Sequence, residues 1–584
     1  MKALVDLLEN KFFEAAKAAY PDIDPQSLFE TIEVTQSTQD KFGHYQCNSA
    51  MRLAKVAKSN PRAIAQALID HVDSGDMIAS MEVAGPGFIN VTLTRNFLGR
   101  GAQALLVDEH LNIDLPEKPQ RVIVDFSSPN IAKEMHVGHL RSTIIGDSLS
   151  RVFTFLGNDV LRLNHVGDWG TQFGMLIAFM KEEAPDVLAG TADTDLGQLV
   201  TWYKASKARF DHDLDFQKRA KKEVVALQGG EAQALKAWKM FCAISEKAYQ
   251  EIYDILDVKI EVRGESFYND MLAGIVADLE KKELVTLSDG AKCVFLDGFI
   301  NRDGDPLPMI VQKSDGGYNY STTDMAAIKH RVEEEKADRL VYITDAGQAT
   351  HFAMFFQAAV KAGYYDPEKV RVDHVPFGLV LGSDGKKFKT RSGDTEKLID
   401  LLNEAVKRAY TIIDERDVDM DEGDKNNLAQ ALGIGAVKYA DLSCHRGGDY
   451  VFSYDRMLRF EGNTAAFLMY SYVRVAGIKR KIKVDVDALI KSGESIVLTH
   501  PSEEALALHL LRFHEALDLV ANELLPHRLT DYLYALAQKF NAFFRDCHVE
   551  GSDEQNSRLL LCEATAKTMK SGFDLLGIQA VERM

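Results

Sequence analysis

Hydrophobic and polar positions change their period repeatedly through the middle of the chain. Short β-branched runs predict strands at residues 121–126, 159–164, 339–344 and 370–374. Apolar residues at helical spacing predict helices at residues 138–156, 171–182 and 349–362. Strands that alternate with helices are typical of a parallel sheet with helical crossovers. We therefore expect an α/β fold in this part of the chain.

The flanking regions have other patterns. The start of the chain mixes amphipathic helices with a strand-like run at 87–93, and long amphipathic runs at 503–524 and 528–546 indicate helices near its end. Charged helices at 211–228 and 231–256, followed by a strand-like run at 291–299, interrupt the alternation. Four domains are expected: an α+β domain at 1–116, a nucleotide-binding domain at 117–395 with an insertion at about 185–300, a helical connecting segment at 396–454 and an α-helical bundle at 455–584.

Length and composition limit the class of protein. At 584 residues the chain is too long for one hydrophobic core, and 46% hydrophobic with 27% charged residues is typical of soluble globular proteins. We find no signal peptide and no apolar stretch of the roughly 18 residues that a membrane span needs. Six scattered cysteines without metal-ligand spacing indicate reduced thiols, so we expect a cytoplasmic protein without membrane contact.

A net charge of −19 argues against a protein that coats nucleic acid indiscriminately. It does not exclude a specific RNA partner that local basic patches hold. One patch is Lys386–Arg391, and the other consists of Arg474, Lys479, Arg480, Lys481 and Lys483. On charge alone, a solvated surface explains each patch equally well.

The tetrad His136-Val137-Gly138-His139 stands where the first strand should turn into a helix. In an α/β sheet, the loop after the first strand brings a ligand to the positive end of the following helix. Imidazoles can donate hydrogen bonds to phosphate oxygens, and Gly138 leaves room for an adenine ring. Lys133 adds a cation three residues earlier. The alternative is that these loop residues simply cap the helix.

The glycine fingerprint of dinucleotide enzymes and the P-loop are both absent. Residues 382–391 instead supply a basic loop from the second half of the sheet, and its lysines could close over a pyrophosphate. A lysine-rich loop alone is more often plain surface. Facing an HxGH turn, it favours a site for nucleoside triphosphate chemistry.

These motifs resemble those of class I aminoacyl-tRNA synthetases, with HxGH early and a KMSKS-like loop late in a split nucleotide-binding fold. Six segments resemble the arginyl-tRNA synthetase family within that class. They are residues 43–48, 85–90, 127–143, 164–174, 575–578 and 581–584. The resemblance covers essentially the whole chain.

The resemblance implies a split Rossmann-like (HUP-type) catalytic domain, an N-terminal domain that contacts the tRNA elbow and a C-terminal bundle that reads the anticodon. The implied substrates are L-arginine, ATP and tRNA(Arg), with Mg²⁺ carried by ATP and no permanent metal or organic cofactor. Arginyl-adenylate forms first, and its arginine then passes to the 2′-hydroxyl of the terminal adenosine. Members of the family generally need bound tRNA for the first step. We expect a monomer.

The resemblance also assigns residues. Those implied to be catalytic are Lys133, His136, Gly138, His139, Lys387 and Lys389, and those toward ATP are His136, Gly138, His139 and Lys387. Those implied to bind arginine are Ser128, Asn130, His139, Tyr320, Asp324 and Gln348. Because a guanidinium pairs naturally with a carboxylate, Asp324 is the first candidate for selecting arginine, and Asp125 is the second. The alternative for Asp324 is a helix cap.

The lysine loop departs from the family pattern in one respect. Aligning residues 387–391 with KMSKS puts Thr390 where the second lysine normally stands. Many members show a similar loss, for which a lysine just before the tetrad is thought to compensate, and Lys133 fits that part. The separate parts of Lys386, Lys387 and Lys389 stay open.

In the C-terminal bundle, Tyr470, Tyr472 and Arg474 suit stacking on splayed bases. An aromatic stripe in a bundle is more often core, and this is the interpretation we prefer for Phe540, Phe543 and Phe544.

Two other functions fit part of the pattern. An HxGH nucleotidylyltransferase for a small metabolite would have no need of the long helical stretch after residue 400. A tRNA-binding relative without activity is disfavoured because the tetrad, Lys133 and Asp324 are all present.

Overall fold

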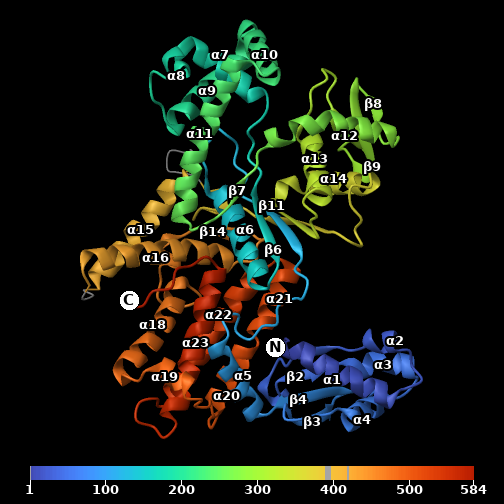
Figure 1. Cartoon of the computed structure of the whole chain (residues 1–584), viewed down its shortest axis with the longest axis vertical. Helices are drawn as coiled ribbons and strands as arrows, with labels where there is room; N and C mark the ends of the chain where they lie inside the picture. Colours follow the sequence, from blue (N-terminus) through green and yellow to red (C-terminus); the bar gives the residue numbers. More distant parts are fainter. Residues whose placement is uncertain (1, 389–395, 417–419) are drawn as a thin grey trace. The chain divides into compact units, whose positions relative to one another are not determined.

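The computed structural model describes residues 2–388, 396–416 and 420–584 (Figure 1). By their internal contacts, these residues form two compact units. One unit combines the chain up to residue 115 with residues 460–574 and 579–584. The other consists of residues 116–459 and 575–578 and contains the predicted parallel sheet.

The sheet of the second unit has five strands, all parallel, in the order β12-β11-β5-β6-β7. The strands are β5 Arg121–Asp125, β6 Asp159–Asn164, β7 Glu261–Val262, β11 Arg339–Asp345 and β12 Arg371–Phe377. Four of them confirm the strands predicted from the sequence. The chain runs outward in one direction from β5 and in the other from β11, so the topological switch point lies between these two strands. Ligands of open α/β sheets bind at such a point, beside the carboxyl ends of the strands.

Helix α6, Val137–Phe155, follows β5 and confirms the predicted first crossover. It packs against β5, β6 and β11, and most of its side chains are buried. Gly146 allows this close approach, because a Cβ there would lie 2.2 Å from the ring of Phe126. The helix therefore holds its first turn firmly at the carboxyl end of the sheet.

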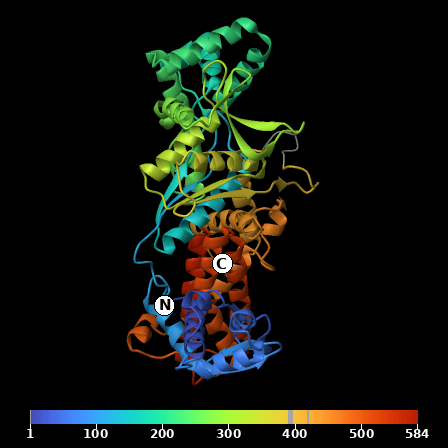
Figure 2. The ribbon, with the colours of Figure 1, turned by 90° about the vertical axis from the view of Figure 1, so that its right-hand side faces the viewer.

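A group of helices follows β6 (Figure 1). It contains α7 Thr171–Glu183, α9 Leu196–His212, α10 Leu214–Gln228 and α11 Ala232–Ile255. These helices pack on one another, and Figure 2 shows them in green as one group. The sequence predicted the helices at 171–182, 211–228 and 231–256 closely. After α11 the chain returns to the edge of the parallel sheet as β7, a strand of two exposed residues that the hydrophobic pattern missed.

The predicted strand at 291–299 is β9, Ala291–Ile300, but it lies outside the parallel sheet. It pairs antiparallel with β8 Thr286–Ser288 and β10 Pro306–Gln312. Together with α12 Asn269–Lys281, α13 Tyr320–Glu333 and α14 Ala349–Lys361, this small sheet shares one hydrophobic core with β5, β6 and β11. The core fixes α13 and α14 beside the parallel sheet.

Two helices follow the lysine loop, namely α15 Leu398–Glu415 and α16 Glu422–Leu442. The chain then forms a short strand, β14 Tyr450–Val451, which pairs in parallel with β13 Val380–Leu381. The expectation of continuous helix after residue 395 therefore misses a strand that supports the start of the lysine loop.

The first unit joins both ends of the chain. Its four-stranded antiparallel sheet has the order β1-β2-β4-β3. The strands are β1 Val34–Gln36, β2 Tyr45–Cys47, β3 Ile78–Ala84 and β4 Phe88–Leu93, and they pack with α1 Leu4–Ala19 and α4 Pro61–His71. The bundle contains α18 Ala465–Ile482, α20 Pro501–Leu511, α21 Phe513–Glu523, α22 His527–Asp546 and α23 Gln555–Leu575.

The predicted helix at 503–524 is two helices, α20 and α21, which meet at Arg512. The side chain of Arg512 lies 4.9 Å from the ring centre of Tyr45 and donates a 2.6 Å hydrogen bond to the carbonyl of His44. Glu515 accepts the Tyr45 hydroxyl at 2.7 Å. The break therefore brings charged side chains of the bundle onto the N-terminal sheet.

Candidate active site

The tetrad forms the start of α6, with His136 as its N-cap. Nδ1 of His136 accepts the backbone N–H of Gly138 at 3.0 Å, and Nδ1 of His139 accepts the backbone N–H of His136 at 3.0 Å. The two ring centres lie 4.2 Å apart. Because each Nδ1 is an acceptor, each neutral ring carries its proton on Nε2. The tetrad is thus both the predicted helix cap and a pair of Nε2–H donors.

Burial keeps both rings neutral. It lowers the pKa of His139 to about 3, helped by the nearby His136 and Lys133. Burial also lowers the pKa of His136, and the charges of Lys387 and Lys133 act in the same direction. Both histidines are therefore hydrogen-bond donors rather than cations at neutral pH, while the lysines and the helix N-terminus supply positive potential.

The lysine loop begins as a tight hairpin. The N–H of Phe388 donates to the carbonyl of Val380 at 3.0 Å, and Gly385 takes a φ of +72° at the turn. Lys387 bridges back to Leu381 and lies close enough to His136 to affect its pKa. Lys389, Thr390 and Arg391 lie outside the described residues.

The chain after the lysine loop contacts the segment before the tetrad. Lys397 forms a 2.8 Å ion pair with Glu134, and the N–H of Leu398 donates to the carbonyl of Met135 at 2.9 Å. Together with the charge of Lys387 near His136, these contacts bring the start of the lysine loop and the segment that carries Lys133 to one place.

The loop between β5 and the tetrad has a strained backbone. Ser127, Ser128 and Ala132 have φ values of +69°, +46° and +59°, a region that costs non-glycine residues about 1–3 kcal/mol each. The N–H of Ser128 donates to Oδ1 of Asn164 at 2.9 Å, and its hydroxyl donates to Asp125 at 3.1 Å. Surrounding hydrogen bonds thus hold the loop in a shape that its sequence alone disfavours.

Asn130 and Lys133 both have exposed side chains on this loop. Asn130 bridges to Gly167, where an added Cβ would lie 2.2 Å from the Asn130 side-chain oxygen. Gly167 therefore lets the asparagine amide rest on the backbone. The Lys133 ammonium lies 5.8 Å from the ring centre of Tyr203, on α9.

Asp324 and Tyr320 lie on the first turns of α13, beside α14. Oδ2 of Asp324 is 2.6 Å from Nε2 of His351, and the ring of Tyr320 meets the His351 ring edge-on with centres 4.7 Å apart. Tyr320 is 61% exposed, so much of its surface is open to a ligand. Gln348, at the N-cap of α14, donates to the carboxylate of Asp345 at 2.8 Å.

Asp125 is paired with a positively charged side chain of the protein. Its carboxylate lies 2.8 Å from the guanidinium of Arg331, which is 1% exposed. Because the Arg331 charge is buried there, Asp125 is needed to neutralise it. Asp125 therefore differs from Asp324, whose carboxylate lies beside His351.

Sequence reasoning missed two titratable residues near Asp324. His351 is one, and its only signal is its position three residues after the Gln348 cap. Glu265 is the other, where burial, together with the charges of Asp324 and Asp168, raises the pKa of the carboxyl to about 8. Nothing in the local sequence marks Glu265, since it comes near Asp324 only through folding.

The aromatic residues predicted for base stacking separate in the bundle. Tyr472 is buried and donates to Glu582 at 3.2 Å, whereas Tyr470 is 41% exposed. The Arg474 guanidinium lies 4.7 Å from the Tyr470 ring centre and 5.8 Å from that of Phe544. Phe544 is 44% exposed, so its prediction as core was wrong, while Phe540 and Phe543 are buried as expected. The exposed Tyr470 and Phe544 therefore flank a partly buried Arg474, whose guanidinium also donates to the Asn541 side chain at 2.7 Å.

Ion pairs neutralise part of the positive charge of the second basic patch. Lys479 pairs with Glu563 at 2.7 Å, and Lys481 pairs with Glu550 at 2.5 Å.

Across the described ranges there is no group of three or more His, Cys, Asp or Glu residues that could hold a metal ion. Within the same ranges, no helix is long and apolar enough to cross a membrane.

Three family models match the chain in succession. Residues 6–93 match the arginyl tRNA synthetase N terminal domain, and residues 102–454 match the catalytic domain of the tRNA synthetases class I (R). Residues 468–584 match the DALR anticodon binding domain.

Whole-chain comparisons agree with these models. An arginine–tRNA ligase of Protochlamydia amoebophila (strain UWE25) is 62% identical, and one of Trichodesmium erythraeum (strain IMS101) is 52% identical, each match covering 100% of both chains. The crystal structure of arginyl-tRNA synthetase from Plasmodium falciparum is 34% identical with a TM-score of 0.86, again over 100% of both chains. The chain belongs to the arginyl-tRNA synthetase family of class I aminoacyl-tRNA synthetases.

Proposed function

We propose that this protein attaches arginine to tRNA in two steps. A carboxylate oxygen of arginine attacks the α-phosphorus of ATP, and pyrophosphate leaves with the bond to that phosphorus. The 2′-hydroxyl of the terminal adenosine then attacks the arginyl carbonyl, AMP leaves, and the hydroxyl proton is released. The observation that carries the proposal is the meeting of two Nε2–H donors with Lys387 at the start of α6, beside the switch point of the sheet.

The ATP end uses the tetrad. Nε2–H of His136 and His139 donate to phosphate oxygens, and Lys387, Lys389 and Lys133 balance the charge of the departing pyrophosphate. The absence of a side chain at Gly138 matters in two ways. A Cβ there would lie 2.9 Å from the His136 ring, and a side chain would fill the space of the adenine. Fixed donors aimed at developing charge lower the barrier without a protein nucleophile. Magnesium enters bound to the ATP phosphates.

The arginine end uses carboxylates. Asp324 takes the guanidinium, Tyr320 and Gln348 lie against it, and Glu265 supplies a second negative charge once the cation arrives. Ser128, Asn130 and His139 surround the backbone end of arginine. We assign Asp125 to the wall of the pocket, through its pairing with Arg331.

The tRNA binds through both ends of the chain. The exposed Tyr470 and Phe544, with Arg474 between them, suit stacking on unpaired anticodon bases, because aromatic faces and guanidinium planes accept any base. The N-terminal domain contacts the tRNA elbow. The monomeric state and the cytoplasmic location stay predictions.

Arginine-dependent exchange of pyrophosphate into ATP tests the proposal, measured with and without tRNA. We expect exchange that requires both arginine and tRNA, and aminoacylation with arginine alone among the amino acids. Exchange that ignores tRNA, combined with transfer of AMP to a small metabolite, would instead identify a nucleotidylyltransferase. Binding of tRNA without any exchange would identify an inactive relative.

A further inference from the structure

The hydroxyl of Tyr249 reaches from α11 to the loop before the tetrad. It lies 2.7 Å from the carbonyl oxygen of Asn130 and 2.8 Å from that of Lys133, and the residue is 2% exposed. A phenol has one proton, so the two carbonyls share it in a three-centre hydrogen bond. One side chain thus fixes both ends of the turn that carries Lys133.

A second residue of α11 holds the middle of the same turn. The N–H of Ala132 donates to Oγ of Ser245 at 3.0 Å, and that hydroxyl donates to the carbonyl of Phe241 at 2.8 Å. Ala132 has a φ of +59°, so the turn does not take this shape by its own preference. Helix α11 supplies the polar partners that hold it.

The Lys133 side chain also contacts the helices between β6 and β7, which we call the inserted helices. Its ammonium lies near the ring of Tyr203 on α9. Its charge in turn reaches His136 and His139. The inserted helices therefore help to hold the turn that carries the Lys133 cation beside the tetrad, together with the hydrogen bonds of the same loop to Asp125 and Asn164.

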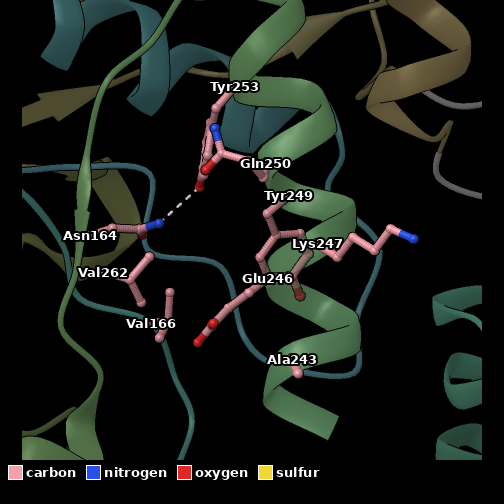
Figure 3. A pocket seen from close by; sticks show the side chains of 9 residues that line it. All are labelled: Asn164, Val166, Ala243, Glu246, Lys247, Tyr249, Gln250, Tyr253 and Val262. Atoms are coloured by element: carbon pink, nitrogen blue, oxygen red, sulfur yellow. Dashed lines mark hydrogen bonds between the residues drawn. The ribbon is translucent and has the colours of Figure 1, made fainter. Parts of the chain in front are cut away.

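A cavity of about 340 Å³ lies directly beside Tyr249, between α11 and the end of β6 (Figure 3). Its lining includes Asn164, Val166, Glu246, Tyr249, Tyr253 and Val262. In Figure 3, Tyr253 contacts Asn164 through the hydrogen bond of 3.0 Å, while Glu246 extends toward Val166. Beside this cavity, the hydrogen bonds of Tyr249 and Ser245 connect the helix to the loop.

We propose that Tyr249 is a positioning residue for adenylate formation, which places the Lys133 ammonium for its work on pyrophosphate by holding the carbonyls of Asn130 and Lys133. The proposal rests on the part given above to Lys133. It gives the inserted helices a direct connection to the chemistry at the tetrad.

The test is the substitution Tyr249→Phe, which keeps the buried ring and removes only the hydroxyl. We expect kcat of arginine-dependent exchange, at saturating tRNA, to fall by about tenfold or more, with KM for arginine changed less than about twofold. In a Lys133→Ala background, the same substitution should cost less than about twofold further, because the group it positions is gone.

A matched control is Tyr532→Phe, which removes another buried hydroxyl that donates to a backbone carbonyl, that of His509 at 2.9 Å. It should lower Tm as Tyr249→Phe does, yet leave exchange unchanged. A wild-type rate in Tyr249→Phe would overturn the proposal, as would equal effects of Tyr249→Phe with and without Lys133. A wild-type rate in Lys133→Ala would also overturn it, whereas absence of arginine-dependent exchange in the unaltered protein would overturn the proposed function itself.

Discussion

The two ends of the proposed site are built in different ways. At the ATP end, His136, Gly138 and His139 lie within four consecutive residues, and their own backbone groups orient both rings. At the arginine end, Asp324 lies on α13, its partner His351 lies on α14, and Glu265 comes from the segment between β7 and α12. The ATP end is formed by neighbouring residues, while the arginine end forms only when three segments that are distant in the sequence pack together. Substitutions should therefore separate the two ends cleanly.

The largest effect is expected at the arginine end, from Asp324→Asn. Removing the carboxylate leaves the guanidinium of bound arginine without its charged partner, so KM for arginine should rise by more than about 100-fold. KM for ATP should stay within about threefold, because the tetrad does not depend on α13. Steady-state exchange kinetics measure both values.

The control for that prediction is Asp297→Asn, which removes an exposed aspartate paired with Lys361 on α14 at 2.9 Å. It should change neither KM. If Asp324→Asn left KM for arginine at its normal value, Asp324 would not be the guanidinium partner.

The next effect belongs to the ATP end. His136→Ala should lower kcat of adenylate formation by about 100-fold, as loss of one fixed donor to developing charge does elsewhere. KM for arginine should change little. His500→Ala is a close control, because Nδ1 of His500 accepts the N–H of Ser502 at 3.1 Å and caps α20 in the same manner.

Equal losses of activity in these two histidine variants would mean that His136 acts as a helix cap alone. A change in stability without a change in kcat is the result expected for His500→Ala only.

A smaller, pH-dependent effect should distinguish the ends further. In the free protein the pKa of Glu265 is raised to about 8, so this carboxyl is protonated at neutral pH. A bound guanidinium favours the ionised form, so binding releases a proton and strengthens as the pH rises toward 8. KM for arginine should therefore fall between about pH 6.5 and 8, by up to about tenfold per unit, and then level off.

Glu265→Gln removes that titration and should flatten the profile of KM for arginine over the same range. KM for ATP should show no corresponding change in either protein. A profile that keeps its slope in Glu265→Gln would assign the proton to another group.

The smallest effect is expected from His351→Gln. An amide can replace the hydrogen bond to Asp324 at 2.6 Å but not the ring that Tyr320 meets. KM for arginine should rise by about three- to tenfold, corresponding to about 1 kcal/mol. An effect as large as that of Asp324→Asn would show that His351 contacts the substrate itself.

The same contrast explains what the sequence could predict. The tetrad, Lys133 and the central strands are recognisable because each depends on neighbouring residues and a clear period. β7 was missed because its two residues are exposed and carry no hydrophobic signal. The break at Arg512 was missed because no glycine or proline marks it, and the contact that Arg512 makes there is with Tyr45, far away in the sequence.

Electrostatic environments were the hardest to predict. Asp125 and Asp324 are both acids beside predicted secondary structure, and only the fold shows that one of them neutralises a buried arginine. Likewise, Phe543 and Phe544 are adjacent on α22, yet one is fully buried and the other is 44% exposed. Helical spacing limits which side chains of a helix can be buried, but packing against the neighbouring helix determines which of them are.

The neutral state of the two tetrad rings has a calorimetric consequence. Because both imidazoles are neutral in the free protein and the nearby Lys133 and Lys387 oppose their protonation, contact of ATP with them should exchange few protons with the solution near neutral pH. The heat of arginine binding, by contrast, should depend on the ionisation enthalpy of the buffer, since Glu265 gives up its proton there. Calorimetric titrations in two buffers would thus distinguish the two ends of the site by the number of protons that ligand binding releases, without a kinetic measurement.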